Sequence, residues 1–396
     1  MRSGISPVEG WQRIFLHYFD ENEEQRARST ISRLSIRTDV PEMVRVVSGI
    51  VPENQFIDDV QKKCVIGIFD SDHRLVPPSV RTGGGGKGVG PRPDAATLDN
   101  AELDDRNACY LGHASVHFGH FLLETLSRAW AWRVLDGDSV PVMQSPPRVP
   151  KFVKSFLALL PGVAERFEFI KRTTRFKNVY VPAPSFVFRR SAHVEFKFLC
   201  ETLAERALPS GVNLTDQPLY LSRRGLGPFA NRALVGEERL ERLLEEEGFL
   251  IVRPETLPIT EQIKLFNSHR WIVSPMGSAC HTRVFSRKEN NILMLTRPDF
   301  TPNFVLCDAL CNGVAHYANV LSAPDSHLGS TAVWEPVLLK EQEILDLMKK
   351  LGLVRPKAEF RGPPPNQELY RERWNRAAAR EAVRGRVPNT PARAEL

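Results

Sequence analysis

The chain has 396 residues, of which 42% are hydrophobic and 25% are charged, enough for two domains with buried cores. This composition excludes a disordered or fibrous protein. The net charge of +6 is concentrated in residues 361–396, which hold eight Arg and four acidic residues. The rest of the chain is nearly neutral, which argues against nucleic acid as a partner and favours a small anionic ligand.

Targeting signals and cysteine pairs are both missing from the sequence. No run approaches the roughly 18 apolar residues of a membrane span, and no apolar N-terminal stretch precedes a cleavage site. We therefore expect a cytoplasmic protein. Without a CxxC pair, the six cysteines are predicted to be reduced core residues: Cys64, Cys109, Cys200, Cys280, Cys307 and Cys311.

The first half of the chain predicts an α/β domain over residues 1–208. Gly and Pro concentrate in residues 76–100 and predict a flexible loop, which lacks the Ser or Thr of a P-loop after its Gly-Lys. Residues 116–135 have apolar residues at helical spacing and predict a long, half-buried helix. The other predicted elements are strands at 167–170 and 179–182 and a helix at 191–208.

One side of the helix predicted at 116–135 is polar, with His117, His120, Glu124 and Arg128. Spacings of three and four residues place these side chains on one helix face, where they can act on one bound molecule. The alternative interpretation is a surface ladder in which Glu124 pairs with Arg128.

A metal site is a second alternative for this segment. Four residues have spacings that a zinc ion can use, which would make a metal-dependent hydrolase: His113, His117, His120 and Glu124. The HExxH motif is absent, and core or capping roles explain the histidines equally well. A weaker candidate set is Cys307, Cys311 and His316.

The second half of the chain alternates strictly between strands and helices over residues 209–335. Strands are predicted at 218–222, 249–254, 271–275 and 291–298, and helices at 237–248 and 260–270. This alternation indicates a parallel, doubly wound sheet, which binds ligands beyond the carboxyl ends of its strands. Ser222-Arg223-Arg224 and Gly277-Ser278 both follow strands and fall where a ligand would lie. A closing helix is predicted within 336–352.

Four segments, in this order, resemble successive motifs of glycosyltransferase family 61. They are GHFLLETLSR (119–128), LYLSRR (219–224), GFLIVRPETLPITEQIKLF (248–266) and WIVSPMGSACHTRVF (271–285). The resemblance covers about residues 105–300, and the ordered set is far more specific than any one segment. Because no anchor segment is evident, the chain resembles the bacterial members, which belong to polysaccharide gene clusters.

The resemblance implies an α/β, GT-B-like fold with two Rossmann-like doubly wound domains facing a cleft. It implies an inverting transfer of a hexosyl or pentosyl group from a nucleotide sugar, expected to be UDP-linked. The expected acceptor is a hydroxyl of a glycan or lipid-linked glycan in capsule, exopolysaccharide or other surface-glycan biosynthesis. Because arginines and a helix N-terminus can hold the departing diphosphate, we expect neither a metal nor a further cofactor.

The resemblance also assigns roles to residues. Residues 1–208 become the acceptor-side domain and 209–335 the nucleotide-sugar-binding domain. His120 and Glu124 are predicted to be catalytic, either one serving as base, with His117 and Arg128 beside the acceptor. The predicted donor-binding residues are Arg223, Arg224, Glu255, Gly277, Ser278 and His281.

The sequence departs from the family pattern at two places. The usual Asn-Glu after the arginine pair is Gly236-Glu237 here, and the usual His-Gly-Ala-Gly-Leu-Thr turn begins with Met276. The loss of the leading His predicts either a different nucleotide sugar or an imidazole supplied by His281. A noncatalytic nucleotide-sugar-binding protein is the remaining alternative.

The tail, residues 353–396, is basic and rich in Pro and Arg, with apolar residues interleaved. Such a segment can rest on anionic lipid at the inner membrane face. A solvated tail is the alternative, which the acidic residues and prolines favour.

Overall fold

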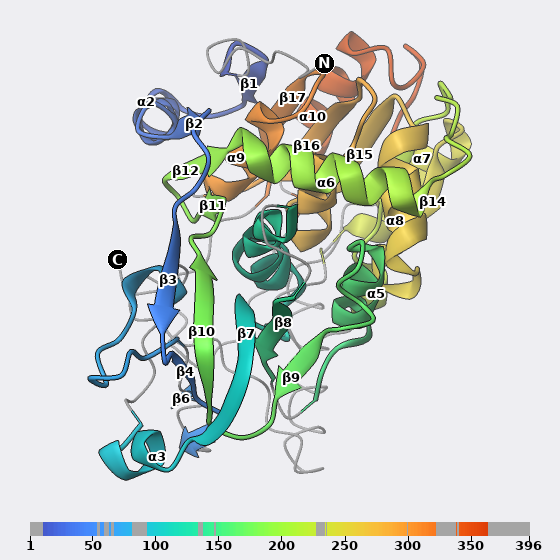
Figure 1. Ribbon diagram of the computed structural model, residues 1–396. Helices are drawn as coiled ribbons and strands as arrows, with labels where there is room; N and C mark the ends of the chain where they lie inside the picture. Colours follow the sequence, from blue (N-terminus) through green and yellow to red (C-terminus); the bar gives the residue numbers. More distant parts are fainter. Residues whose placement is uncertain are drawn as a thin grey trace, which may run out of the picture. The chain divides into compact units, whose positions relative to one another are not determined.

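The computed structural model describes residues 11–53, 56–58, 63–64, 67–80, 93–133, 138–145, 148–226, 234, 236–298, 300–321, 338 and 340–362. The chain forms two compact units (Figure 1): unit 1 is Met1–Arg33 with Ser210–Leu396, and unit 2 is Leu34–Pro209. Most of the predicted Gly/Pro loop, residues 81–92, and most of the basic tail, residues 363–396, lie outside the described residues.

Unit 1 is built on six parallel strands in the order β1-β17-β16-β15-β13-β14. They are β1 (Ile14–His17), β13 (Leu219–Leu221), β14 (Leu250–Val252), β15 (Trp271–Pro275), β16 (Asn291–Thr296) and β17 (Ala315–Asn319). After β13 the chain adds β14 on one side of it and then β15 on the other. The carboxyl ends of β13 and β15 therefore flank a topological switch point, the place where open α/β sheets bind ligands.

The helices of unit 1 follow the apolar periodicity of the sequence. They are α2 (Glu21–Ile31), α7 (Glu237–Glu246), α8 (Ile259–Ser268), α9 (Asn303–Ala309) and α10 (Glu341–Lys350), with the 3-10 segments η4 (Arg224–Leu226), η5 (Pro254–Thr256) and η6 (Ser278–Phe285). In α7, Leu240, Leu243 and Leu244 are buried on one face. They join one core cluster with Tyr220 of β13 and Val273 of β15.

A fully buried arginine anchors η6 to its neighbours. Arg283 forms a 2.9 Å ion pair with Asp308 of α9, and its Nε donates to the side chain of Asn290. Its Nη2 donates to the main-chain oxygens of Asn290 and Val314. Asp308 also accepts a hydrogen bond from Tyr317 of β17. The guanidinium is thereby tied to α9 and to the residues that precede β16 and β17, and its buried charge is compensated by Asp308.

We expect Arg283→Leu to destabilise unit 1 strongly, because the carboxylate of Asp308 stays buried without its counter-charge. Removing one partner of a buried pair costs about 3–5 kcal/mol. Urea unfolding followed by circular dichroism measures the change. The control is Arg270→Leu, which breaks an exposed 2.8 Å pair with Asp216 and should cost less than about 1 kcal/mol. Small and equal losses in both variants would contradict the anchoring role of Arg283.

Unit 2 is built on a mixed sheet in the order β3-β10-β7-β8-β9, with β4 also pairing with β10. The strands are β3 (Met43–Val47), β4 (Ile50–Val51), β7 (Glu102–His113), β8 (Val140–Gln144), β9 (Glu168–Ile170) and β10 (Thr174–Pro182). β7 to β10 run parallel, whereas β3 and β4 are antiparallel to β10. Unit 2 therefore differs from the expected doubly wound domain. Its strands β3 and β4 precede the parallel strands in the chain and pair antiparallel with β10 at the edge of the sheet.

Smaller elements complete unit 2. Two further sheets are β11-β12-β2 and the hairpin β5-β6. Their strands are β2 (Ser35–Arg37), β5 (Phe56–Asp58), β6 (Lys63–Cys64), β11 (Phe186–Val187) and β12 (Ser191–His193). The helices are α3 (Ala95–Asp99), α5 (Lys151–Leu159), α6 (Val194–Ala207) and the 3-10 turn η1 (Pro77–Ser79).

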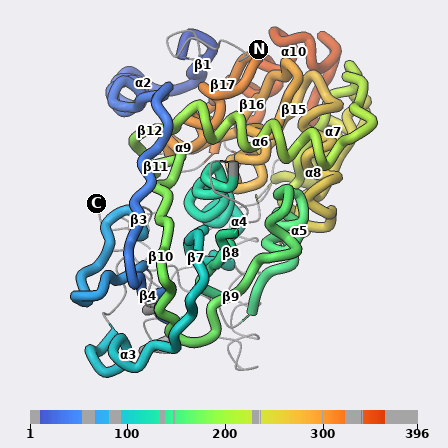
Figure 2. Tube along the Cα trace, in the orientation of Figure 1, coloured from blue at the N-terminus to red at the C-terminus, as the bar shows by residue number. Residues whose placement is uncertain are grey.

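The helix predicted at 116–135 forms, but it is not a uniform α-helix. It begins as an α-helical turn, α4 (Phe118–His120), widens into a π-helical turn, η2 (Phe121–Thr125), and tightens into a 3-10 helix, η3 (Leu126–Arg133). The N–H of Leu126 donates to the carbonyl of Phe121, five residues back. Figure 2 shows the segment beside β7. π-helical turns inside a helix are frequent at functional sites.

The N-terminal segment belongs to unit 1, which differs from the expected division at residue 208. β1 pairs in parallel with β17 and extends the edge of the unit 1 sheet. Short strands of this type give no local signal of their partner, because the pairing spans almost the whole chain. Unit 2 ends at Pro209. Within the described residues, no helix is long and apolar enough to span a membrane.

Candidate functional site

The predicted histidine and carboxylate of unit 2 are in direct contact. His120 Nδ1 lies 2.7 Å from Glu124 Oε2, because the two residues are four apart across the first helical turns. The side chain of Glu124 is 7% exposed and that of His120 is 28% exposed. When Nδ1 carries the proton and donates to the carboxylate, Nε2 is left as the acceptor. The imidazole is therefore the more accessible member of the pair.

Aromatic rings hold the His120 imidazole in place. Phe188, in the turn between β11 and β12, stacks on it with the ring planes 5° apart and the centroids 5.2 Å apart. His117 packs edge-on at 5.0 Å. His117 is exposed, and its place beside an acceptor stays a prediction. These contacts limit the imidazole to one orientation, which general base chemistry requires.

Arg128 lies in the interior rather than beside a ligand. Its guanidinium donates to three main-chain oxygens, those of Pro78, Val80 and Pro182. Burial lowers its pKa, and the nearby Glu124 partly opposes that shift. The polar helix face predicted from the sequence does not continue past Glu124, because a 3-10 helix turns about 120° per residue instead of about 100°. Arg128 thus lies on the buried side of the His120–Glu124 pair and supports it from the interior.

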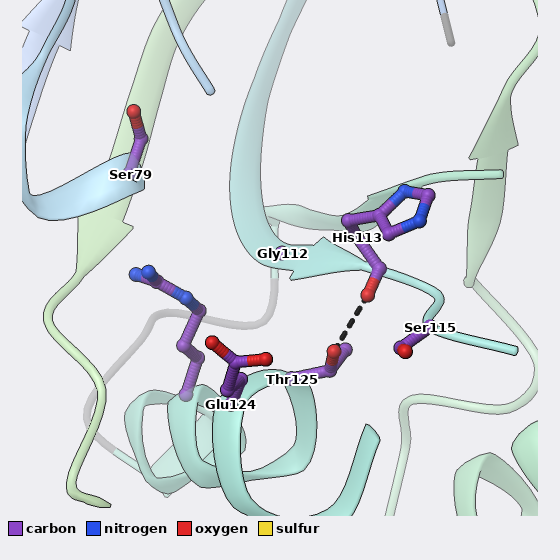
Figure 3. Close-up of a pocket in the computed structure, with 7 residues that line it drawn as sticks. Ser79, Gly112, His113, Ser115, Glu124 and Thr125 are labelled. Atoms are coloured by element: carbon purple, nitrogen blue, oxygen red, sulfur yellow. Dashed lines mark hydrogen bonds between the residues drawn. The ribbon is translucent and has the colours of Figure 1, made fainter. Parts of the chain in front are cut away.

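The end of β7 faces the buried side of the pair. Figure 3 shows Glu124 and Thr125 extending from the helix toward Gly112 and His113, and Thr125 donates to the main-chain oxygen of His113. Gly112 has φ +98°, and a Cβ there would lie 3.3 Å from Arg128 Cδ. A cavity of about 20 Å³ lies among these residues, room for about one water molecule. It is too small for a sugar.

In unit 1, Arg223 joins the ends of two strands. It follows β13, and its Nη1 donates to the main-chain oxygen of Met276, directly after β15. A Cβ on Gly277 would lie 3.4 Å from the same Nη1. The predicted donor residues Arg223 and Gly277 are therefore neighbours at the switch point of the sheet, and Ser278 begins η6 beside them. Main-chain amides at such a turn can add to the arginine in binding an anion.

The other predicted donor residues are placed differently from one another. Arg224 is partly exposed and pairs with Glu241 of α7 at 2.7 Å. Glu255 borders the same loop, since its Oε1 would lie 1.8 Å from a Cβ added to Gly225. His281 is buried, with its ring stacked on Phe304 at 4.4 Å. The structure therefore gathers all of the predicted donor residues except His281 around the ends of β13, β14 and β15.

A metal site finds no support in the described part of the chain. No three His, Cys, Asp or Glu side chains among those residues are grouped so as to hold an ion. His120 is instead engaged with Glu124 and Phe188. The hydrolase alternative, which needs such a group, is not favoured.

The comparisons with known proteins agree with the motif order. A family model described as Glycosyltransferase 61 matches residues 118–293, which include the His120–Glu124 pair and the arginine pair. Residues 118–293 are a glycosyltransferase 61 domain. The resemblance is therefore confirmed, and the family indicates glycosyltransferase activity. No curated protein matches the chain closely enough to count as a relative.

Glu237 is a residue of the glycosyltransferase 61 domain that the predicted site omitted. It begins α7, and its Oε1 accepts from the N–H of Arg223 at 2.7 Å and from the hydroxyl of Tyr220 at 3.1 Å. Burial raises its pKa to about 7, and the hydrogen bond from Arg223 opposes that shift. The signal was present in the sequence as the glutamate of the family's Asn-Glu pair. Only the fold shows that it contacts the arginine loop.

The raised pKa of Glu237 predicts a pH-dependent stability. Its value is about 7 in the folded chain against an ordinary 4.5, so the protonated form is favoured by folding. Its contribution is complete below pH 4.5 and is lost as the pH rises through 7, by up to about 3 kcal/mol. Urea midpoints at pH 5 and pH 8 measure it. Glu237→Gln, which stays neutral, should lose less stability over this range than the wild type.

The matched control is Glu238→Gln, which removes a 55% exposed carboxylate from the same helical turn. Its pH profile should follow that of the wild type. Parallel profiles for the wild type and Glu237→Gln would show that Glu237 is ionised over the whole range in the folded protein.

Proposed function

We propose that this glycosyltransferase 61 domain transfers a sugar from a nucleotide-sugar donor to a hydroxyl group with inversion of configuration. The observation that carries the proposal is the position of Arg223, beside Gly277 at the switch point of a parallel sheet. Nucleotides bind at such points in open α/β sheets. A guanidinium there can form two parallel hydrogen bonds to a diphosphate.

In this proposal His120 is the base and Glu124 orients it. An inverting transfer is a single displacement, in which the acceptor hydroxyl must lose its proton as it attacks. His120 is the more exposed member, and the carboxylate at its Nδ1 favours the tautomer with a free Nε2. The buried carboxylate also stabilises the imidazolium that forms after proton transfer.

The leaving group needs positive charge rather than a proton. Arg223 and Arg224, with the amides near Gly277, would stabilise the departing nucleoside diphosphate. Within this proposal unit 1 supplies the diphosphate grip and unit 2 the base, in a two-domain enzyme of GT-B type that uses no metal. A UDP-linked hexose or pentose, a surface-glycan acceptor and a cytoplasmic location complete the proposal, all on the strength of the family resemblance.

For the donor site, Arg223→Lys is the sharpest change, because lysine keeps the charge and loses the planar fork. Affinity for the bound nucleotide sugar should fall by about 1–3 kcal/mol, as for a charge-assisted contact. A thermal-shift panel of nucleotide sugars identifies the ligand, and calorimetry measures its affinity. The control is Arg270→Lys, at the opposite end of β15. Equal affinity in the wild type and both variants would remove Arg223 from the donor site.

For the catalytic pair, His120→Ala and Glu124→Gln should each lower turnover by about 10²–10⁴-fold, because each disables general base catalysis. Nucleotide-sugar affinity should change little. The control is Asp99→Asn, which neutralises the carboxylate of another histidine pair in unit 2, the exposed 3.2 Å contact with His73. Wild-type turnover in folded His120→Ala would assign the pair a structural role, and sugar-nucleotide binding without any turnover in the wild type would favour the noncatalytic alternative.

A further inference from the structure

Two buried carboxylates lie directly behind the arginine pair of unit 1. Glu237 and Glu241 are four residues apart on α7, so they share one helix face. Their exposed fractions are 1% and 4%. Each has one satisfied oxygen: Glu237 Oε1 accepts from Arg223 and Tyr220, and Glu241 Oε2 accepts from Arg224. The other two oxygens, Glu237 Oε2 and Glu241 Oε1, are buried without a hydrogen-bond partner in the described structure.

This arrangement is short of donors and of positive charge. Arg223 directs Nη1 to the main chain of Met276, and it is the backbone N–H of Arg223 that reaches Glu237. Arg224 pairs with Glu241 while 39% of its side chain remains in solvent. A proton on either glutamate would relieve the repulsion between the two carboxylates and turn an unsatisfied oxygen into a donor. The charge of Glu241 also raises the pKa of Glu237, so the two carboxylates are electrostatically coupled.

A diphosphate at the arginine loop changes the balance of charge. It brings negative charge to Arg223 and Arg224, the same cations that offset the two carboxylates. Like charges close together favour the protonated form of a carboxyl group. Binding of the diphosphate and binding of a proton should therefore favour each other, since linkage between two ligands is reciprocal.

We propose that Glu237 and Glu241 hold one proton between them, and that a nucleotide-sugar diphosphate binding at Arg223 and Arg224 draws that proton from solvent into the pair. The inference rests on the proposed function, because it assumes that a diphosphate is the ligand of this loop. Glu237 and Glu241 act here as positioning residues. Their protonation sets the charge behind the arginines, and neither needs to touch the donor.

The other titratable groups around the pair do not replace it. Burial and the neighbouring Glu237 raise the pKa of Tyr220 well above its ordinary value, so its hydroxyl stays neutral. Burial also raises the pKa of the Cys280 thiol, and the charge of Arg223 opposes that shift. Glu238 is exposed at 55% and lies 3.8 Å from Arg224. Glu255 and Arg253 border the same loop at Gly225. The pKa of Glu237 is the one that lies near neutral pH, at about 7, so the exchangeable proton is assigned to the pair.

The test is proton-linked binding of nucleotide sugars that carry a diphosphate diester, which does not itself titrate near neutral pH. The probes are UDP-glucose, UDP-N-acetylglucosamine, UDP-xylose, GDP-mannose and dTDP-rhamnose. Calorimetry at pH 7 in buffers of different ionisation enthalpy counts the protons taken up on binding. We expect uptake of a fraction of one proton, and a Kd that rises from pH 7 to pH 8 by at most about tenfold, the limit for one linked proton.

Three variants locate the proton. Glu237→Gln should abolish the uptake and flatten the pH dependence of Kd while the protein still binds, and Glu241→Gln should reduce both. Glu238→Gln, the exposed control, should behave as the wild type. Binding without proton uptake in the wild type, or uptake that survives in Glu237→Gln, would overturn the inference and leave the donor site in place. If no probe binds to the wild type, the diphosphate site and the inference both fall.

Discussion

A guanidinium that is removed from water must find acceptors in several directions at once, and this requirement shapes both units. In unit 1, Arg283 is fully buried and bonds to Asp308, Asn290 and Val314. These partners lie in or beside α9, β16 and β17, so the arginine fixes η6 against three elements. η6 begins directly after the turn that Arg223 contacts. The position of the loop at the switch point therefore depends on the fully buried charge of Arg283.

The same requirement operates in unit 2, where Arg128 satisfies the carbonyls of Pro78, Val80 and Pro182. Only a chain that leaves room can accept such a side chain, and Gly112 provides it through a positive φ and the absence of a Cβ. The buried Glu124 carboxylate then lies with a guanidinium on its inner side and the His120 imidazole on its outer side. A carboxylate so supported can accept the hydrogen bond that orients an imidazole.

The sequence was sufficient to predict features that depend on local pattern. The apolar runs at 219–221 and 271–275 form parallel strands as predicted, and the residues after them meet at the switch point. Features set by distant contacts were not predictable. The π and 3-10 turns at 121–133 change which side chains share a helix face, so Arg128 does not lie on the polar face predicted from the sequence. The contact of Glu237 with the Arg223 loop exists only because α7 begins beside the end of β13.

The two departures from the family motifs are compatible with this geometry, and the reason lies in the backbone. Gly236 takes φ +92° before α7, a left-handed conformation that Gly and Asn tolerate better than other residues. Glycine in place of the usual asparagine therefore leaves Glu237 where the arginine loop needs it. At the second departure, Arg223 is bound by the main-chain oxygen of Met276. Every residue type supplies that oxygen, so the loss of a histidine side chain does not by itself displace the arginine. What methionine changes is the side chain at this turn, whereas the main-chain contact with the arginine is kept.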